Sequence, residues 1–536
     1  MRIEEFPIDE QELDRFIDVN RTLWDDPGKD AGRPPIYVNL SMVRLQVSWF
    51  LPKLLYAKGM AEISGSEVRV LTWRKNPQLT RFLESFHIRH IAIDELDLQN
   101  PAACLKAFSK TAAAWITASD GKALQQLRFS GLHVGESLYE DVLRTSPLST
   151  IRSARTFMIT KKLLHLSWSF YALESLLKKE GIAFGLMDDS AYHEGMFARL
   201  FMHYGAKTFS VNDWLERPVS LNSEDGFDRD AWNLREFMAA KLPELTEKEE
   251  QEALELLTAR FSGKNGRKID TGAFAGRVAT RKELAEEMGL DPAKKNVVIM
   301  AHTFSDGVFN QGRLYYRDYY DWLEQTLILA GDIPEVNWIL KPHPTRSAYN
   351  ESVDSIEAMY ERYRKPHIHF FPDSVSAESV AELADVLVTI GGNAGLEFAC
   401  FGIPPVITGK PFYHGFGFTT EPASRQSYEE CLKHIADLPR LEPEQISDAR
   451  KLFWVKNNLT KLSPAYFRDD FVKVNDKHYL EMIDAMALSY FDSNVDTAPY
   501  NTKSLAEITE WMKTGDLRKT EYYLRGKAMA AYLFQS

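Results

Sequence analysis

The sequence predicts an α/β protein with two Rossmann-like domains that face each other across a cleft, followed by a helical C-terminal extension. The chain has 536 residues, and a single hydrophobic core stops growing at about 250 to 300 residues. Short apolar runs alternate with helical stretches in both halves of the chain, which is typical of parallel sheets with helical crossovers. A strongly charged, helical stretch separates the two halves and marks the interdomain connection.

The first half is expected to form an acceptor-binding domain over residues 1–222. Its strands are expected at 36–40, 68–72, 90–93, 182–187 and 206–211. Helices are expected for about a dozen residues after Val43 and at 76–86, 102–126, 153–179 and 192–204. Residues 223–275 are the charged helical connection.

The second half repeats the same pattern and is expected to form a nucleotide-sugar-binding domain over residues 276–427. Its strands are expected at 297–301, 338–341, 367–371, 386–390 and 405–407. Its helices are expected at 315–330, 355–363, 376–384 and 396–400. Residues 428–536 are predicted to be helical, covering the second domain or crossing back to the first.

Composition excludes several classes of function. The 64 basic and 76 acidic residues give a net charge of −12, which disfavours nucleic acid as a partner. The three cysteines form no C-x-x-C pair, so neither a disulfide framework nor a thiolate metal site is expected. Residues 1–10 show no secretory signal, and Pro52, Lys53 and Lys58 interrupt the longest apolar stretch, so no membrane span is expected. A cytoplasmic protein fits these features.

The most informative segment is DVLVTIGGNAGLEF, in which a buried strand runs into a glycine-rich turn and a short helix. Unpaired backbone N–H groups at such a turn can hold a phosphate without cationic side chains. The candidate phosphate-binding residues are Gly392, Asn393, Ala394 and Gly395. Glu397, in the first turn of the helix, could accept hydrogen bonds from ribose hydroxyls. The alternative is that the glycines serve only close strand-to-helix packing.

Two further segments follow strands of the second domain at the edge where open α/β sheets bind ligands. K-P-H-P holds His343 between two prolines, which suits a donor aimed at a leaving phosphate, and Lys341 adds charge nearby. A-H-T-F-S-D supplies His302 and Ser305, which could line the donor pocket. A turn histidine in the first segment and a turn-capping hydroxyl in the second are the alternatives.

In the first domain, M-D-D-S-A-Y-H-E-G lies at the carboxyl end of an expected strand and carries a cluster of carboxylates. Asp189 or Asp188 could act as the general base on an acceptor hydroxyl, with Glu194 as a competitor. Capping of the following helix by Asp188, Asp189 or Ser190 is the alternative. No H-E-x-x-H, P-loop or G-x-S-x-G motif and no Cys/His cluster with ligand spacing occurs, so no metal or other cofactor is expected.

These segments resemble one family. K-P-H-P, A-D-V-L-V-T, G-G-N-A-G-L-E, F-G-I-P-P-V and K-P-F-Y-H-G-F-G-F-T, within residues 297–420, resemble capsule polysaccharide synthesis and export proteins of the Kdo-transferase type. That family is similar in layout to bacterial sialyltransferases, whose GT-B domains hold the CMP phosphate with a His-Pro motif and a hydroxyl-rich turn. The resemblance implies that His343 contacts the donor phosphate and Glu397 the ribose or base.

The resemblance is incomplete at one point. Gly391 and Gly392 stand where such proteins commonly carry two hydroxyl side chains, so phosphate contacts would come from the backbone alone. The first half of the chain matches only through D-D-S-A-Y-H-E-G.

The resulting hypothesis is a metal-independent GT-B glycosyltransferase that moves Kdo or another CMP-linked acid sugar to a surface polysaccharide or glycolipid acceptor. Asp189 and His343 are its expected catalytic residues. A looser resemblance, to glycerophosphotransferases of teichoic acid synthesis, leaves transfer of a CDP-linked polyol phosphate open, and a non-catalytic capsule assembly component is the third possibility. Basic residues among aromatics in 513–534 raise the possibility of peripheral contact with the inner face of the membrane, a solvated helix being the alternative.

Overall fold

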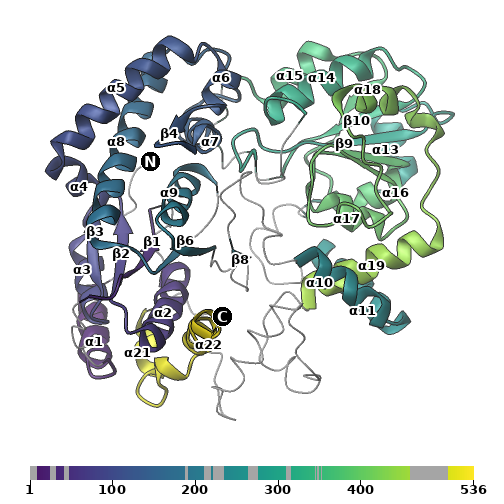
Figure 1. The fold of residues 1–536 in the computed structure, drawn as a ribbon. Coiled ribbons are helices and arrows are strands. Elements are labelled where there is room, and N and C mark those ends of the chain that lie inside the picture. The colour runs from purple at the N-terminus through teal and green to yellow at the C-terminus, as the bar shows by residue number, and fades with distance from the viewer. Residues whose placement is uncertain are drawn as a thin grey trace.

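The structure is a computed structural model, and it contains one mostly parallel and one fully parallel sheet, each flanked by helices (Figure 1). It describes residues 9–24, 32–41, 47–187, 191–210, 219–220, 234–262, 274, 276–309, 315–344, 346, 349, 351, 353–458 and 505–535. The predicted fold class, two Rossmann-like domains with a helical C-terminal extension, is confirmed.

The sheet of the first domain has six strands in the order β3-β2-β1-β6-β7-β8. Only the last pairing, of β7 with β8, is antiparallel. The strand order therefore reverses between β1 and β6, and this reversal defines the ligand-binding edge of such sheets. The strands are β1 (Ile36–Asn39), β2 (Val68–Thr72), β3 (Arg89–Ala92), β6 (Phe184–Met187), β7 (Lys207–Ser210) and β8 (Val219–Ser220).

The predicted helices of the first domain are observed outside residues 93–145, and Glu10–Asn20 forms a further helix that was not predicted. The predicted helix 102–126 is two helices, because the chain is extended at Ala118 and the Asp120 side chain caps a new helix by accepting from the Ala123 N–H. A hairpin and a further helix, α7, follow and were not predicted. The elements are α1 (Glu10–Asn20), α2 (Val47–Ser64), α3 (Pro77–Glu84), α4 (Ile93–Gln99), α5 (Pro101–Thr117), α6 (Gly121–Gln125), β4 (Arg128–Phe129), β5 (Leu132–His133), α7 (Gly135–Thr145), α8 (Phe157–Glu180) and α9 (Tyr192–His203).

The second sheet is entirely parallel, with the order β11-β10-β9-β12-β13. Its strands β10 and β12 are buried along their whole length, as expected for a sheet covered on both faces. The order reverses between β9 and β12. The elements are α13 (Arg281–Met288), β9 (Asn296–Met300), α14 (Tyr319–Gly331), β10 (Asn337–Lys341), α15 (Ile356–Tyr363), β11 (Ile368–Phe370), a 3₁₀ turn (Ala377–Ser379), α16 (Val380–Leu383), β12 (Val386–Thr389), α17 (Ala394–Ala399) and β13 (Pro405–Ile407).

The charged connection contains α10 (Leu234–Lys241), a 3₁₀ turn (Leu242–Glu244) and α11 (Glu247–Phe261). Thr246 and Glu249 form a capping box that starts α11. Its acidic residues bind α19 (Pro443–Asn458): Glu252 accepts from the Trp454 indole at 2.7 Å. These helices therefore pack on the second domain.

The C-terminal extension is divided between the domains. α18 (Arg425–Lys433), a 3₁₀ turn (Ile435–Asp437) and α19 belong to the second domain, whereas α21 (Leu505–Trp511), a 3₁₀ turn (Leu517–Lys519) and α22 (Glu521–Gln535) lie against α1 and α2 (Figure 1). A Cβ atom on Gly59 would lie 1.9 Å from the Tyr523 carbonyl oxygen, and one on Gly526 would lie 2.0 Å from that of Tyr56. The two glycines let the α2 and α22 backbones touch.

This packing accounts for the apolar stretch of residues 45–63, most of which is the buried helix α2. No helix in the described residues combines the length and apolar character that crossing a membrane requires. Of the C-terminal basic residues, Lys527 pairs with Glu62, Lys513 with Glu510 and Arg518 with Asp516, and Arg525 is buried.

We predict that Gly526→Ala destabilises the first domain, because the added methyl group must push α22 away from the α2 backbone. The expected loss is about 1 to 3 kcal/mol of unfolding free energy, measured by urea denaturation. Gly331→Ala is the matched control, because its new methyl group would meet only the Lys365 side chain at 3.6 Å. Equal stability of the two variants would contradict the close helix contact.

Candidate functional site

The carboxyl ends of β9, β10 and β12 bring together three segments that the sequence analysis selected. β9 leads to His302, β10 to His343 and β12 to the glycine turn at Gly392. In the sheet, Met300 is the register partner of Lys341, and Ile299 is the partner of Val388. The three segments therefore meet at the point where the strand order reverses.

His302 lies directly against the glycine turn. Its Nε2 is 3.4 Å from the Thr389 hydroxyl, and a Cβ on Gly392 would lie 3.3 Å from its Cε1. Its ring also contacts the Tyr319 ring, with 4.8 Å between the centroids. Burial, and after it the nearby His343, lowers the pKa of His302 to about 3. The imidazole is therefore neutral at physiological pH.

His343 is close enough to His302 to lower the pKa of that residue by its charge. Burial lowers the pKa of His343, while Asp306 acts in the opposite direction and Lys341 adds to the lowering. Burial also lowers the pKa of Lys341 to about 8, and its ammonium lies over the Phe371 ring, 4.7 Å from the centroid. An anion bound at this edge would favour the protonated form of both groups.

The glycine turn is rigidly held. The Gly392 carbonyl accepts from the Gly395 N–H at 3.0 Å and from the Tyr413 hydroxyl at 2.7 Å. A Cβ on Gly395 would lie 2.2 Å from that hydroxyl, so only glycine fits there. The Lys456 ammonium donates to the Asn393 side chain at 2.7 Å. Within the described part of the chain, the amides of residues 391–394 donate no hydrogen bond, whereas that of Gly395 is already used.

Two predicted donor-site residues have partners inside the protein. Glu397 is buried in α17, and its carboxylate lies 3.3 Å from the Arg260 Nε of α11. Ser305 is also buried, and both its hydroxyl and its N–H donate to Glu351, at 2.8 and 2.9 Å. Burial raises the pKa of Glu351. Ser305 thus anchors a neighbouring loop.

In the first domain, the predicted bases Asp188 and Asp189 lie outside the described residues. Glu194 is buried in the first turn of α9. No group of three or more His, Cys, Asp or Glu side chains is arranged to hold a metal ion among the residues that the structure describes.

The sequence analysis did not select a Ser–His–Asp relay that lies at the strand-order reversal of the first sheet. The Ser41 hydroxyl is 2.8 Å from His193 Nε2, and His193 Nδ1 is 2.6 Å from the Asp141 carboxylate. Lys162 lies 2.6 Å from the other carboxylate oxygen. The His193 hydrogen bond and charge, together with Lys162, hold the pKa of Asp141 far below its usual range despite burial. The relay keeps His193 oriented, as a carboxylate does for a general base.

Beside this relay lies a side-chain amide whose N–H₂ group has no hydrogen-bond partner. The side-chain N–H₂ of the buried Asn39, at the end of β1, has no hydrogen-bond acceptor among the described residues. Its oxygen accepts from the Ser41 N–H at 3.2 Å. Trp73, which is partly exposed, contacts the His193 ring with 4.9 Å between centroids. The edge thus combines a hydroxyl, an imidazole, an unused donor and an aromatic face.

Tyr192 joins the two edges. Its hydroxyl donates to Asp306 at 3.1 Å and accepts from the Gly307 N–H at 3.1 Å, both in the loop after β9. Its backbone is left-handed, with φ of 58°, which is strained for a bulky residue. Burial, and then Asp306, raises the pKa of the phenol, which stays neutral and can donate.

Two buried carboxylates add hydrogen bonds between the same two domains, and we call this set of contacts with those of Tyr192 the junction. Glu140 of α7 accepts from the Tyr192 N–H at 3.0 Å and from the Phe309 N–H of the second domain at 2.7 Å. Asp318, which caps α14, accepts from the hydroxyls of Tyr139 and Thr150 in the first domain. The domains therefore meet in a hydrogen-bonded interface, and α7 belongs to it.

No family model matches the chain, and no curated protein matches it. Among solved structures, KpsC of Thermosulfurimonas dismutans, a β-Kdo 2,7 transferase, is 15% identical, with 52% of this chain and 79% of that chain covered and a TM-score of 0.30. Anabaena Alr3699/HepE, solved with UDP and glucose, is 13% identical over 80% and 95% of the two chains, with a TM-score of 0.27. The UDP-GlcNAc 2-epimerase of Neisseria meningitidis is 12% identical over 80% and 96%, with a TM-score of 0.23. Because these identities and TM-scores are low, the fold is assigned from the strand order of the two sheets and not from these similarities.

We predict that the buried His302 makes the protein less stable as pH falls. Its pKa is about 3 in the folded state and 6.5 in the unfolded chain, so the unfolded chain binds the additional proton between these values. When the pH falls from 6 to 4, the unfolding free energy of the wild type should fall by about 1 to 2 kcal/mol more than that of His302→Gln. Urea denaturation at a series of pH values measures this. His434→Gln, at an exposed site, is the control, and parallel profiles for wild type and His302→Gln would refute the assignment.

Proposed function

We propose that the protein is a glycosyltransferase that moves a sugar from a nucleotide donor on the second domain to a glycan acceptor presented by the first domain. The proposed donor is Kdo or another CMP-linked acid sugar, and the proposed acceptor is a surface polysaccharide or a glycolipid. The observation that carries the proposal is the convergence of His302, His343 and the unused amides of residues 391–394 at one edge of the second sheet.

This edge is suited to a nucleotide phosphate. Backbone N–H groups bind phosphate oxygens without net charge, and a neighbouring imidazole can add a charged hydrogen bond once it is protonated. We assign His343 to stabilise the leaving phosphate, with Lys341 as a nearby charge. Glu397 remains the proposed ribose contact only if the Arg260 ion pair opens, because that pair now occupies its carboxylate.

On the acceptor side, we propose Asp189 as the base that takes the proton of the acceptor hydroxyl as the bond from the sugar to the donor phosphate breaks. His193 is a second candidate, because Asp141 orients its ring and a hydroxyl already lies at its other nitrogen. The acceptor hydroxyl would take the place of the Ser41 hydroxyl. Trp73 offers an aromatic face for a sugar ring.

The test is transfer of the sugar from CMP-Kdo to a capsule oligosaccharide by purified variants. His343→Ala should lower kcat by about 10² to 10⁴-fold, as expected for loss of a group that acts on a developing charge or proton. Asp189→Ala and His193→Ala distinguish the two candidate bases, because replacing the true base should lower kcat by a similar factor. His434→Ala and Asp332→Ala, at sites away from both edges, should keep full activity.

Two outcomes would redirect the proposal. Near-full transfer by both His343→Ala and Asp189→Ala would contradict the assigned roles. Phosphate in the product of a CDP-linked donor would instead establish polyol-phosphate transfer. Since the described residues hold no group of three or more side chains arranged to bind a metal, we expect transfer to persist in EDTA, and its loss would require a metal.

A further inference from the structure

The outer surface of the first domain carries a concentration of exposed apolar side chains. Eleven large hydrophobic residues are exposed in the described part of the chain, and six of them lie on α5 and at the start of α8. Phe157 is 85% exposed and Ile116 is 72% exposed. We call these six residues the outer patch: Leu105, Phe108, Trp115, Ile116, Phe157 and Met158. Contiguous exposed apolar surface usually marks an interaction site.

Helix α5 carries apolar side chains on two faces, and only one of these faces packs on α8. Its inner face carries small buried residues, Ala103, Ala107, Thr111 and Ala114, that let it pack closely on α8. Its outer face carries Leu105, Phe108 and Ile116 at helical spacing, whereas the partly exposed Trp115 lies at the border with the inner face. An ordinary surface helix would place charged residues there.

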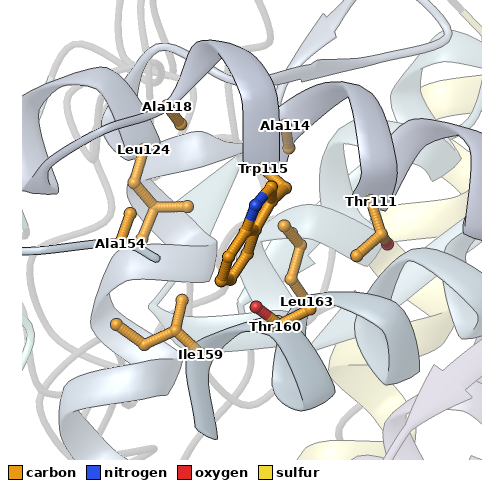
Figure 2. A pocket seen from close by; sticks show the side chains of 9 residues that line it. All are labelled: Thr111, Ala114, Trp115, Ala118, Leu124, Ala154, Ile159, Thr160 and Leu163. Carbon is orange, nitrogen blue, oxygen red and sulfur yellow. The ribbon is translucent and has the colours of Figure 1, made fainter. Parts of the chain in front are cut away.

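The end of α5 lies beside the segment that leads into α8. Arg155, just before α8, donates to the carbonyl oxygens of Trp115 at 3.0 Å and Ile116 at 2.8 Å. Figure 2 shows the Trp115 indole across a small cavity between α5 and α8, lined largely by apolar side chains such as Leu124 and Leu163. The end of α5 is thus fixed against α8, so that the exposed rings have a defined position.

The charge around the patch is opposite to that of the whole chain. Residues 101–117 and 151–162 contain no Asp or Glu, although the chain has a net charge of −12. Lys110, Arg155 and Lys161 are exposed, and none of them pairs with a carboxylate in the described residues. Lys161 lies one turn of α8 from Phe157, whereas Lys110 lies on the flank of α5 opposite Phe108. Apolar side chains next to basic residues are the composition that binds the interface of an anionic bilayer.

We infer that the outer patch docks the protein on an anionic membrane surface, with its apolar side chains among the lipid headgroups and Arg155 and Lys161 facing their phosphates. The C-terminal basic residues are less suited to this role, because Lys527 binds Glu62 and Arg525 is buried. The inference does not depend on the proposed transfer reaction.

Flotation of the full chain with lipid vesicles tests this docking. Vesicles in which about a third of the lipid is phosphatidylglycerol should carry the protein at low salt, and those of pure phosphatidylcholine should carry much less. Ile116→Ser with Phe157→Ser, and separately Lys161→Glu, should each weaken partitioning about tenfold. Val278→Ser with Val353→Ser is the matched control, since both valines are about as exposed, 60% and 59%, but lie outside the patch.

Equal flotation of wild type and both patch variants would overturn the inference, and so would equal binding to the two kinds of vesicle. A dimer in solution that the Ile116→Ser, Phe157→Ser variant abolishes, without any flotation of the wild type, would assign the patch to a second copy of the chain instead. The far-ultraviolet spectrum and the urea midpoint of each variant establish that it is folded.

Discussion

The hydrogen bonds of the Tyr192 hydroxyl hold the ligand-binding edges of the two sheets against each other. Tyr192 begins α9 with a left-handed backbone, and its hydroxyl reaches Asp306 and Gly307 in the loop after β9. Such a backbone costs about 1 to 3 kcal/mol, which the paired groups of the junction must offset. Glu140 also holds this turn in place, because its carboxylate accepts from the Tyr192 N–H and from the Phe309 N–H. The position of His193, the next residue, and of the loop that carries His302 both depend on this contact.

These contacts join the segment after β6 in the first sheet to the segment after β9 in the second. On one side, His193 is oriented by Asp141 and faces Ser41. On the other side, burial keeps His302 neutral and lowers the pKa of His343. The two imidazoles at this edge are therefore largely neutral at neutral pH, and an arriving phosphate would raise their pKa values and strengthen its own hydrogen bonds. Binding and protonation are coupled at this edge.

Much of this fold could be predicted from the sequence, because buried parallel strands are short apolar runs and their parallel direction follows from the alternation with helices. The convergence of His302, His343 and the glycine turn followed from the same rule, since all three come after strands. Interactions between distant segments could not be predicted. His193 finds Asp141 and Ser41 at separations of 52 and 152 residues, and the Arg260 partner of Glu397 lies in the charged connection. α7 was missed because its buried face packs partly on the other domain, where Tyr139 binds Asp318.

The central claim is that the edge between β9 and β12 binds a nucleotide phosphate. The most direct measurement is the shift of the thermal unfolding midpoint in CMP, CDP, UDP and GDP, for the wild type and for His343→Ala. A ligand at a hundred times its Kd stabilises the folded state by about 2.7 kcal/mol. We predict that CMP raises the midpoint of the wild type and raises that of His343→Ala much less. If no nucleotide raises the midpoint, or if His343→Ala responds like the wild type, the claim is contradicted.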